Sequence, residues 1–435
     1  MKNQILIVLF TGLLPLFTMA QLTMNLEYRP RAEARYGYKM LPDSASKPLY
    51  GFSHRARLNF FYQKDWLKLG FGIQDVRIWG DENIYSSTGV YGSEASIDLS
   101  EGWVQMSFLK YSSIKIGRQF LVYDDRRLIS DRNWNQSSLF YDAILYNYAK
   151  EKLSIDAVVS LNLEKDTLFM NRYTTKKMKT LDLVHATYAF SPQFKASAIV
   201  VGSGYTKDDK SETIYMRGTY GTFLEYKKEG ATVWGSLYYQ NGKNSKGRDV
   251  STYNVNIYGN RKFGKLTAGA GFSLVSGDKI EAADTTSAGG TDNLFDLLYG
   301  NSHQQYGHLD YFSSMGKGTA NGGLIDYYVT LEYQMTEKTA LLADYHHFTL
   351  QQDIVDPRYD PIDISKTISE RSLGHEFDLG FRIIFNKIVK LQGGYSFMFQ
   401  DSTLETIQYK ESGNTEFPSW GWLMLTVNPE IFSMK

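Results

Sequence analysis

Hydrophobic and polar residues alternate one by one through most of this chain, and that period of two limits the possible folds more than any other feature. In residues 22–36, Leu26 and Tyr28 fall on one side, while Glu27 and Arg29 fall on the other. A period of two is typical of β-strands, in which successive side chains point to opposite faces. The same alternation recurs in residues 265–275, 325–334 and 376–385. We therefore expect an all-β fold.

The spacing of these segments favours a membrane barrel over a soluble sandwich. The gaps between about 18 candidate strands alternate between short and long. Short gaps lie around Lys64, Lys110, Lys150, Ser191, Lys228, Phe263, Thr336 and Lys387. Long gaps include residues 37–48, 80–96, 121–138, 278–323 and 351–371. This predicts a transmembrane, antiparallel, up-and-down β-barrel with short periplasmic turns and long extracellular loops, with sixteen strands as the alternative count.

The N-terminus has the pattern of an export signal. Lys2 precedes an apolar run over residues 5–17, and the small residue Ala20 follows shortly afterwards. Such a run is too short for a membrane-spanning helix and is typical of a secretory signal peptide. We expect cleavage after Ala20, which leaves residues 21–435 as one barrel domain in the outer membrane.

Composition excludes several other classes. The chain has 47 basic and 47 acidic residues, so a nucleic-acid-binding surface is not expected, and it has no cysteine to form a disulfide. Tyrosine and tryptophan near strand ends are expected to form the interfacial girdles of the barrel. These candidates are Tyr28, Tyr62, Trp66, Trp79, Tyr188, Trp420 and Trp422.

Strand parity places many charges on the face opposite the apolar one. These residues are Glu27, Arg29, Arg31, Glu33, Arg35, Arg55, Arg57, Arg217, Asp326, Glu332, Asp344, Glu376, Asp378 and Arg382. Because unpaired charges are costly to bury, this face is predicted to line a water-filled channel. The arginines of the first two strands favour anionic solutes, and the alternative is that they pair with Glu27, Glu33 and Asp75. A β-bulge near Gln74 is predicted to turn Asp75 and Arg77 inward.

Several motifs resemble those of the alginate export family of outer-membrane barrels. They are Gln74-Asp75-Val76-Arg77-Ile78-Trp79-Gly80-Asp81, Leu99-Ser100-Glu101-Gly102-Trp103-Val104-Gln105, Lys115-Ile116-Gly117-Arg118-Gln119 and Tyr141-Asp142-Ala143. Later segments that resemble the family include Phe295-Asp296 and Leu373-Gly374-His375-Glu376-Phe377-Asp378. The resemblance implies a monomeric barrel with an arginine-rich lumen, associated with passage of anionic polysaccharide. It adds Glu101, Arg118 and Asp142 to the expected solute path and supports Arg77 there.

The long loops and the histidines are the remaining candidates for function. Loops 121–138 and 278–323 are each expected to be either a constriction or a solvated outer surface. His303, His308 and Asp310 could form a metal cluster, and His185 could serve a barrel lipase, but we expect no cofactor, no metal and no enzyme activity.

Three functions therefore compete. They are a channel for anionic polysaccharide, oligosaccharide or small anions, a general or nutrient-uptake porin, and a barrel enzyme or adhesin. The expected partners are membrane lipid, lipopolysaccharide and the barrel-assembly machinery, together with the transported solute.

Overall fold

The computed structural model describes most of the chain. The described residues are 20–80, 97–163, 166, 168–169, 173–175, 177–208, 211–280, 290–361, 363–411 and 413–434. All but the last residue of the predicted signal peptide lies outside them, as do residues 81–96 and 281–289 of two long connections.

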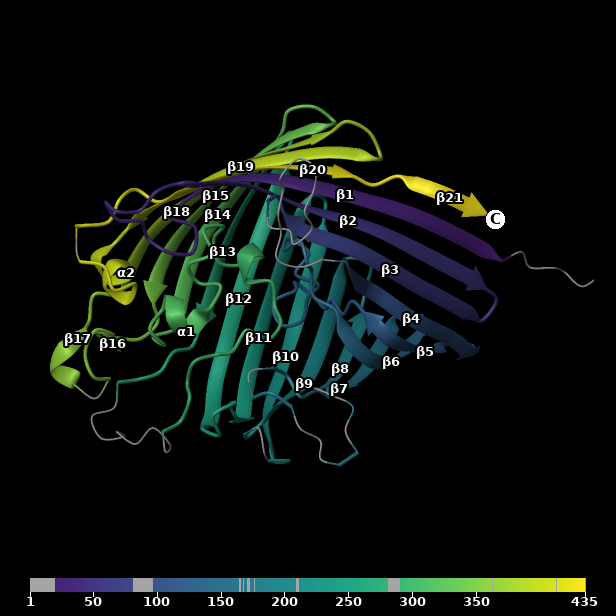
Figure 1. Ribbon diagram of the computed structural model, residues 1–435, viewed down its shortest axis with the longest axis horizontal. Helices are drawn as coiled ribbons and strands as arrows, with labels where there is room; N and C mark the ends of the chain where they lie inside the picture. The colour runs from purple at the N-terminus through teal and green to yellow at the C-terminus, as the bar shows by residue number, and fades with distance from the viewer. Residues whose placement is uncertain are drawn as a thin grey trace, which may run out of the picture.

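The described strands close into one antiparallel barrel (Figure 1). Its strands are β1 (Gln21–Tyr36), β2 (Leu49–Lys64), β3 (Leu67–Ile78), β4 (Ile97–Leu109), β5 (Ser112–Gln119), β6 (Tyr141–Lys150), β7 (Leu153–Leu161), β8 (Thr180–Ala189), β9 (Phe194–Thr206), β10 (Ile214–Lys228), β11 (Ala231–Lys243), β12 (Asp249–Phe263), β13 (Leu266–Val275), β14 (Leu324–Gln334), β15 (Thr339–Leu350), β18 (Ser372–Ile384), β19 (Val389–Gln400), β20 (Ser419–Val427) and β21 (Glu430–Met434). Because β20 and β21 both pair with β1, they share the last place in the ring. The barrel therefore has 18 strand positions, and the predicted fold is confirmed.

Short elements lie in the long connections. They are β16 (Ile354–Val355), β17 (Thr367–Ile368), α1 (Met315–Gly318), α2 (Ser402–Ile407) and the 3₁₀ turns η1 (Ser302–Gln304) and η2 (Ile364–Lys366). Figure 1 shows α1, α2, β16 and β17 towards its left, while β21 ends at the right. Nowhere in the described ranges is a helix both long and apolar enough to cross a membrane.

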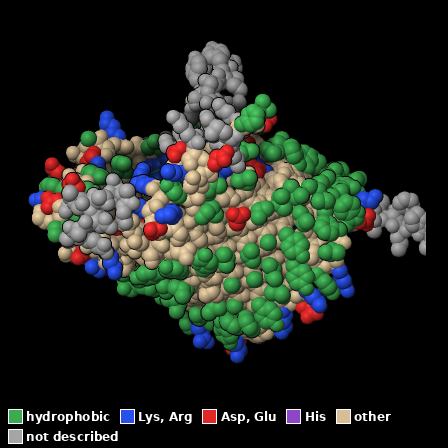
Figure 2. Space-filling view, turned by 90° about the horizontal axis from the view of Figure 1, so that it is seen from below, with side chains coloured by type: hydrophobic (Ala, Val, Ile, Leu, Met, Phe, Trp, Pro, Cys, Tyr) green, Lys and Arg blue, Asp and Glu red, His purple; other side chains and the backbone are tan. Residues whose placement is uncertain are grey.

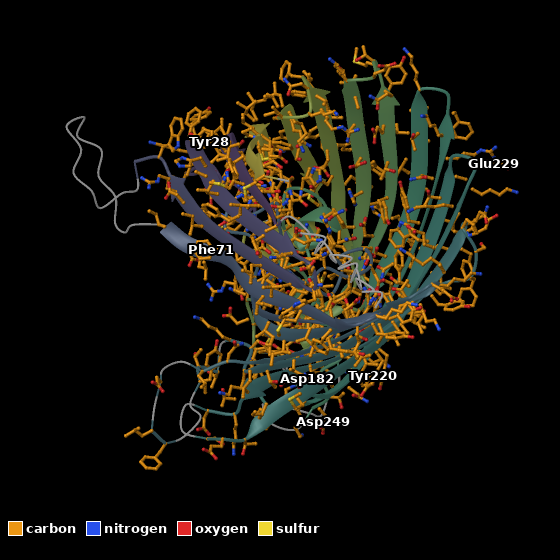
Figure 3. The ribbon with its side chains drawn as sticks, turned by 90° about the vertical axis from the view of Figure 1, so that its right-hand side faces the viewer. Tyr28, Phe71, Asp182, Tyr220, Glu229 and Asp249 are labelled. Carbon is orange, nitrogen blue, oxygen red and sulfur yellow. The ribbon has the colours of Figure 1, made fainter. Side chains whose placement is uncertain are left out.

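Short and long connections alternate as predicted. Only residues 65–66 join β2 to β3, whereas residues 120–140 join β5 to β6 and residues 276–323 join β13 to β14. The register pairs Leu22 with both Tyr62 and Met434, so β1 begins and β21 ends at the short-turn side of the barrel. Figure 3 views the barrel from the right-hand side of Figure 1 and labels Glu229 in the short β10–β11 turn.

Alternation gives each strand an outer apolar face. Phe71, Leu379 and Leu423 are between 46% and 49% exposed, which suits contact with lipid. Hydrophobic side chains form a broad band over the face of the barrel shown in Figure 2, and many charged side chains lie at its edges. Two predicted girdle residues do not belong to this face. Trp420 is fully buried and its Nε1 donates to the inward Glu33, and Trp422 packs beside it.

The interior of the barrel contains a packed core made largely by its own loops. Loop 120–140 and loop 276–323 pair through Ile129 and Tyr299, and they bury Phe295 and Phe312 completely. Gly300 allows the close approach, because a Cβ there would lie 1.9 Å from the carbonyl oxygen of Arg127. The long loops therefore fold into the barrel and narrow it at the long-loop end.

Candidate functional site

Five arginines form a basic wall on the inner face of β1 and β2. The basic wall comprises Arg29, Arg31, Arg35, Arg55 and Arg57. Strand parity predicted this face correctly, because the register places Arg29 opposite Arg55. The prediction that these charges face open water is wrong for four of the five. Arg29, Arg31, Arg55 and Arg57 are at most 7% exposed, because loop 120–140 covers them.

Loop 120–140 supplies the hydrogen-bond acceptors that make this burial possible. Arg29 Nη1 donates to the carbonyl of Asn133 at 2.8 Å, and Arg29 Nε donates to Gln136 Oε1 at 3.1 Å. Arg31 Nη1 donates to the carbonyl of Trp134 at 3.1 Å, and its guanidinium lies 4.5 Å from that indole. These acceptors satisfy the N–H groups but carry no charge, so they leave the positive potential of the wall in place.

Two carboxylates lie within the basic wall. Glu27 bonds to Arg55, and Glu33 lies 3.2 Å from Arg31 Nε and 2.9 Å from Arg35 Nη2. The structural ion pairs that the sequence offered as the alternative are thus formed by Glu27 and Glu33. Five guanidinium groups against two carboxylates still leave three net positive charges on the inner face of β1 and β2.

An acidic wall lies on β14, β15 and β18, separated from the basic wall by β19 and β20. The acidic wall comprises Asp326, Asp344, Glu376 and Asp378. His346 Nδ1 lies 3.0 Å from both oxygens of Asp326, and Glu376 Oε1 accepts the backbone N–H of Leu309 at 2.7 Å. Asp378 is 3% exposed, and neither of its oxygens has a hydrogen-bond partner among the described residues.

Loop 276–323 is held against the acidic wall by residues 303–310. Gly307 has a φ of +74°, and a Cβ there would lie within 2.7 Å of the Glu376 carboxylate. His303 Nδ1 donates to Asp310 Oδ1 at 2.8 Å, and Tyr38 Oη donates to Asp310 Oδ2 at 2.5 Å. Burial lowers the pKa of His303 more than the nearby Asp310 raises it, so His303 is neutral at pH 7.

The charge of Asp310 is stabilised by the same contacts. Burial disfavours its carboxylate, but the neighbouring His303 and the bonds from His303 and Tyr38 outweigh that effect and lower the pKa of Asp310. His308 stacks on His303 with ring centroids 5.0 Å apart. The structure thus assigns these residues to loop packing, and the described residues contain no group of three or more metal-ligating side chains.

Three further predicted site residues face the interior. Arg217 on β10 bonds to Asp296 and Gln240, and Arg382 on β18 pairs with Glu332 at 2.5 Å. Glu101 on β4 lies opposite Gly72 and accepts from Trp103 Nε1 at 3.2 Å.

Asp75 and Arg77 do not line the interior, which corrects the prediction. The β2–β3 register is continuous and places them opposite Ala56 and His54, on the outer face that carries Tyr28. The irregularity lies on β4, where Ser100 is left between the partners of Gly72 and Ile73. Asp75 therefore bonds to Arg77 and His54 on the outer side of the barrel.

Arg118 and Asp142 are also on the outer face. They lie opposite each other and pair at 2.9 Å. Two residues along these strands, Ile116 and Ile144 also lie opposite each other and are 39% and 46% exposed, as lipid-facing residues are. The solute path that the resemblance implied at these positions is thus wrong.

The side chains around His185 do not form the pair that a lipase needs. His185 Nε2 lies 3.0 Å from Asp124 Oδ1, and the hydroxyl of Ser197 donates to the same oxygen at 2.6 Å. Serine and histidine therefore share a carboxylate instead of bonding to each other, as a nucleophile and its base would.

The sequence did not identify the residues that complete the site. Gln136 covers the basic wall, and Arg132, Asp292 and Asp296 surround Arg217 and a cavity beside it. The only sequence signals were the density of charge in loop 121–138 and the Phe295-Asp296 motif.

Comparison with known proteins agrees with this architecture. The model of a family described as alginate export matches residues 20–414. No curated protein matches the chain significantly. OccAB4 of Acinetobacter baumannii is 12% identical with a TM-score of 0.63, and the match covers 95% of this chain and 99% of that chain.

Two Pseudomonas aeruginosa structures are similarly related. OpdL is 12% identical with a TM-score of 0.59, covering 94% of this chain and 99% of that one. OpdK with vanillate is 10% identical with a TM-score of 0.58, covering 95% and 99%. At identities this low, the structural similarity shows that the barrel fold is shared.

Proposed function

The chain belongs to the alginate export family, and from that premise we propose that it is a constricted channel that favours small anionic solutes, carboxylates above all, over long polymers. That it is an outer-membrane channel follows from the family and the fold. The selectivity and the size of the solute are the parts that we propose.

The basic wall carries the selectivity proposal. Arg29 and Arg57 bond only to uncharged oxygens, from loop 120–140 and Gln74, so their charges are not neutralised locally. In the low-dielectric interior of a barrel, a fixed positive potential attracts anions and repels cations.

The infolded loops support the proposal on size. Leu128 and Ile129 of loop 120–140 and Phe312 of loop 276–323 are at most 3% exposed and fill part of the cross-section. One barrel of the same fold is known with vanillate, a small aromatic carboxylate. We therefore favour small carboxylates over polysaccharide chains, which remain the second candidate because of the family described as alginate export.

We also propose that the chain is a monomer and has no catalytic role. The outward apolar face covers the barrel, and the Asp124-bridged arrangement of His185 and Ser197 supports no nucleophile. A general porin with little charge preference is the remaining alternative, which the acidic wall would favour.

Solute uptake into proteoliposomes tests this function directly. Swelling rates should rank glucuronate above glucose, and both above a uronate octamer, which we expect the infolded loops to exclude. Equal rates for glucuronate and glucose would support the general porin. Fast entry of the octamer would support polymer passage and overturn the size restriction.

A further inference from the structure

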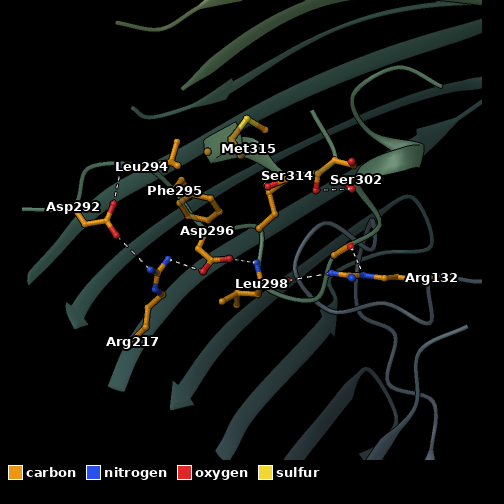
Figure 4. A pocket seen from close by; sticks show the side chains of 14 residues that line it. Arg132, Arg217, Asp292, Leu294, Phe295, Asp296, Leu298, Ser302, Ser314 and Met315 are labelled. Atoms are coloured by element: carbon orange, nitrogen blue, oxygen red, sulfur yellow. Dashed lines mark hydrogen bonds and ion pairs between the residues drawn. The ribbon is translucent and has the colours of Figure 1, made fainter. Parts of the chain in front are cut away.

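A cavity lies between β10 and loop 276–323, at the long-loop end of the barrel (Figure 4). Its volume is about 370 Å³, which is at the lower end of the range for small-molecule sites. Arg217 enters it from β10, Arg132 from loop 120–140, and Asp292, Asp296 and Met315 from loop 276–323. Three separate segments therefore build one partly open site.

One end of the cavity carries a net negative charge. Arg217 Nη1 lies 3.1 Å from Asp296 Oδ2, and Arg217 Nη2 lies 3.7 Å from Asp292 Oδ2. One guanidinium thus faces two carboxylates, and the Asp296 side chain remains 41% exposed. Gln240 Oε1 accepts from Arg217 Nη1 at 3.1 Å and also from the backbone N–H of Asp296 at 3.0 Å, which fixes both partners.

The other end carries a positive charge. Arg132 Nε donates to the carbonyl of Gly300 at 2.9 Å, and Arg132 Nη2 donates to the carbonyl of Leu298 at 3.2 Å. These acceptors orient the guanidinium without neutralising it. Among the residues that the structure describes, Arg132 has no carboxylate within ion-pair distance.

The whole cavity is electrically balanced but polar from end to end. Arg132 and Arg217 offset Asp292 and Asp296, so a ligand with a net charge would leave one charge in the cavity without a partner. Leu294, Leu297 and Met315 add apolar surface to the lining of the cavity. A ligand with opposite charges at its two ends and a short apolar linker matches all three features.

We propose that this cavity binds a small zwitterion, with its carboxylate at Arg132 and its ammonium at Asp296. The site goes beyond the proposed anion preference, since it holds a solute of no net charge. It gives the channel a saturable binding step in addition to diffusion.

Three probes with four carbons each separate the contributions of the two ends. Isothermal titration of the full-length protein in detergent should give tighter binding of 4-aminobutanoate than of butanoate or butylammonium, by about tenfold, because each missing end loses one charge-assisted contact. Equal binding of 4-aminobutanoate and butanoate would overturn the proposal and leave a simple anion site. Absence of any saturable binding would also overturn it.

Two variants assign the ends. Arg132→Gln should weaken the binding of 4-aminobutanoate about tenfold and leave the binding of butylammonium unchanged. Asp296→Asn should weaken the binding of 4-aminobutanoate by a similar factor and leave the binding of butanoate unchanged. Arg132→Lys should restore most of the loss, and Arg118→Gln on the outer face is the matched control. A loss in Arg118→Gln, or equal losses for all probes in Arg132→Gln, would indicate general disruption and contradict the assignment.

The outcome is independent of the proposed function. An anion-selective channel without zwitterion binding would remove this site and leave that function intact. Zwitterion binding in a channel without anion preference would support this site and overturn the proposed function.

Discussion

The basic wall on β1 and β2 and the acidic wall on β14, β15 and β18 bury their charges in different ways. The buried arginines of the basic wall meet an infolded loop that offers carbonyl and amide oxygens, so most of their guanidinium nitrogens donate a hydrogen bond. The acidic wall receives fewer donors, and neither oxygen of Asp378 accepts a hydrogen bond among the described residues. A guanidinium has five donors that neutral backbone can satisfy, whereas a carboxylate needs N–H groups aimed at it. The basic wall therefore keeps its charge, and the carboxylates of the acidic wall are the less completely hydrogen-bonded groups of the interior.

The largest expected effect comes from removing the basic wall. Replacing Arg29, Arg31, Arg55 and Arg57 together by glutamine should abolish anion preference, because it removes four of the five positive charges. The chloride-to-potassium permeability ratio in planar bilayers measures this.

The outer pair provides the matched control for that experiment. Arg118→Gln with Asp142→Asn removes charges of the outer face and should leave the ratio unchanged. An unchanged ratio in the quadruple variant would assign the arginines a purely structural role.

Next in size is the difference between two aspartates of the acidic wall. Asp326→Asn should destabilise the barrel by about 1–3 kcal/mol, since it weakens a charge-assisted bond to the buried His346. Asp378→Asn should cost less, since Asp378 accepts no hydrogen bond and its nearest imidazole nitrogens, of His308 and His346, lie 3.7 and 4.0 Å away. Heat-modifiable electrophoresis gives both melting temperatures. Equal losses in the two variants would refute the distinction between them.

Acidification should loosen the contact of loop 276–323 with the acidic wall. The folded pKa of His303 lies below its unfolded value of 6.5, so the docked loop binds fewer protons than the released loop. Its stabilising contribution is therefore complete above pH 6.5 and is lost as the pH falls. Asp310, whose pKa is also lowered, adds a loss in the same direction below about 4.

Cysteine labelling can measure this loosening, because the chain has no native cysteine. Leu309→Cys is fully buried in the docked loop, while Ser313→Cys is exposed and reports the intrinsic pH dependence of the reaction. The ratio of their maleimide rates should rise between pH 7.5 and 5, and His303→Gln should flatten that rise. A ratio independent of pH would exclude His303 as the cause.

The smallest effect is expected at the Arg382–Glu332 pair, which lies on β18 and β14 nearer the short-turn end than the acidic wall does. Both side chains are about one-third exposed, so the pair should contribute less than about 1 kcal/mol. Arg382→Gln should shift the melting temperature only slightly, and a large shift would show that this pair is coupled to the walls.

The sequence predicted the barrel because alternation is local. The alternation within each strand separates its inner from its outer residues, and the loop lengths distinguish the short-turn end of the barrel from the long-loop end. The face of Arg29 and Arg55 followed correctly from parity. Arg118 was assigned from a motif, although its parity with Ile114 and Ile116 already indicated the outer face.

The burial of the basic wall could not be predicted in the same way. The bonds from Arg29 to Asn133 and Gln136 join residues more than 100 positions apart, and nothing in either segment encodes the other. The bulge was expected near Gln74, but the extra residue is Ser100, because an irregularity between two strands can be accommodated on either one.

The reversal potential of the wild-type channel across a tenfold potassium chloride gradient tests the central claim most directly. The three uncompensated charges of the basic wall predict a potential of the sign that chloride permeation gives. A potential near zero, or of the sign that potassium gives, would contradict the account.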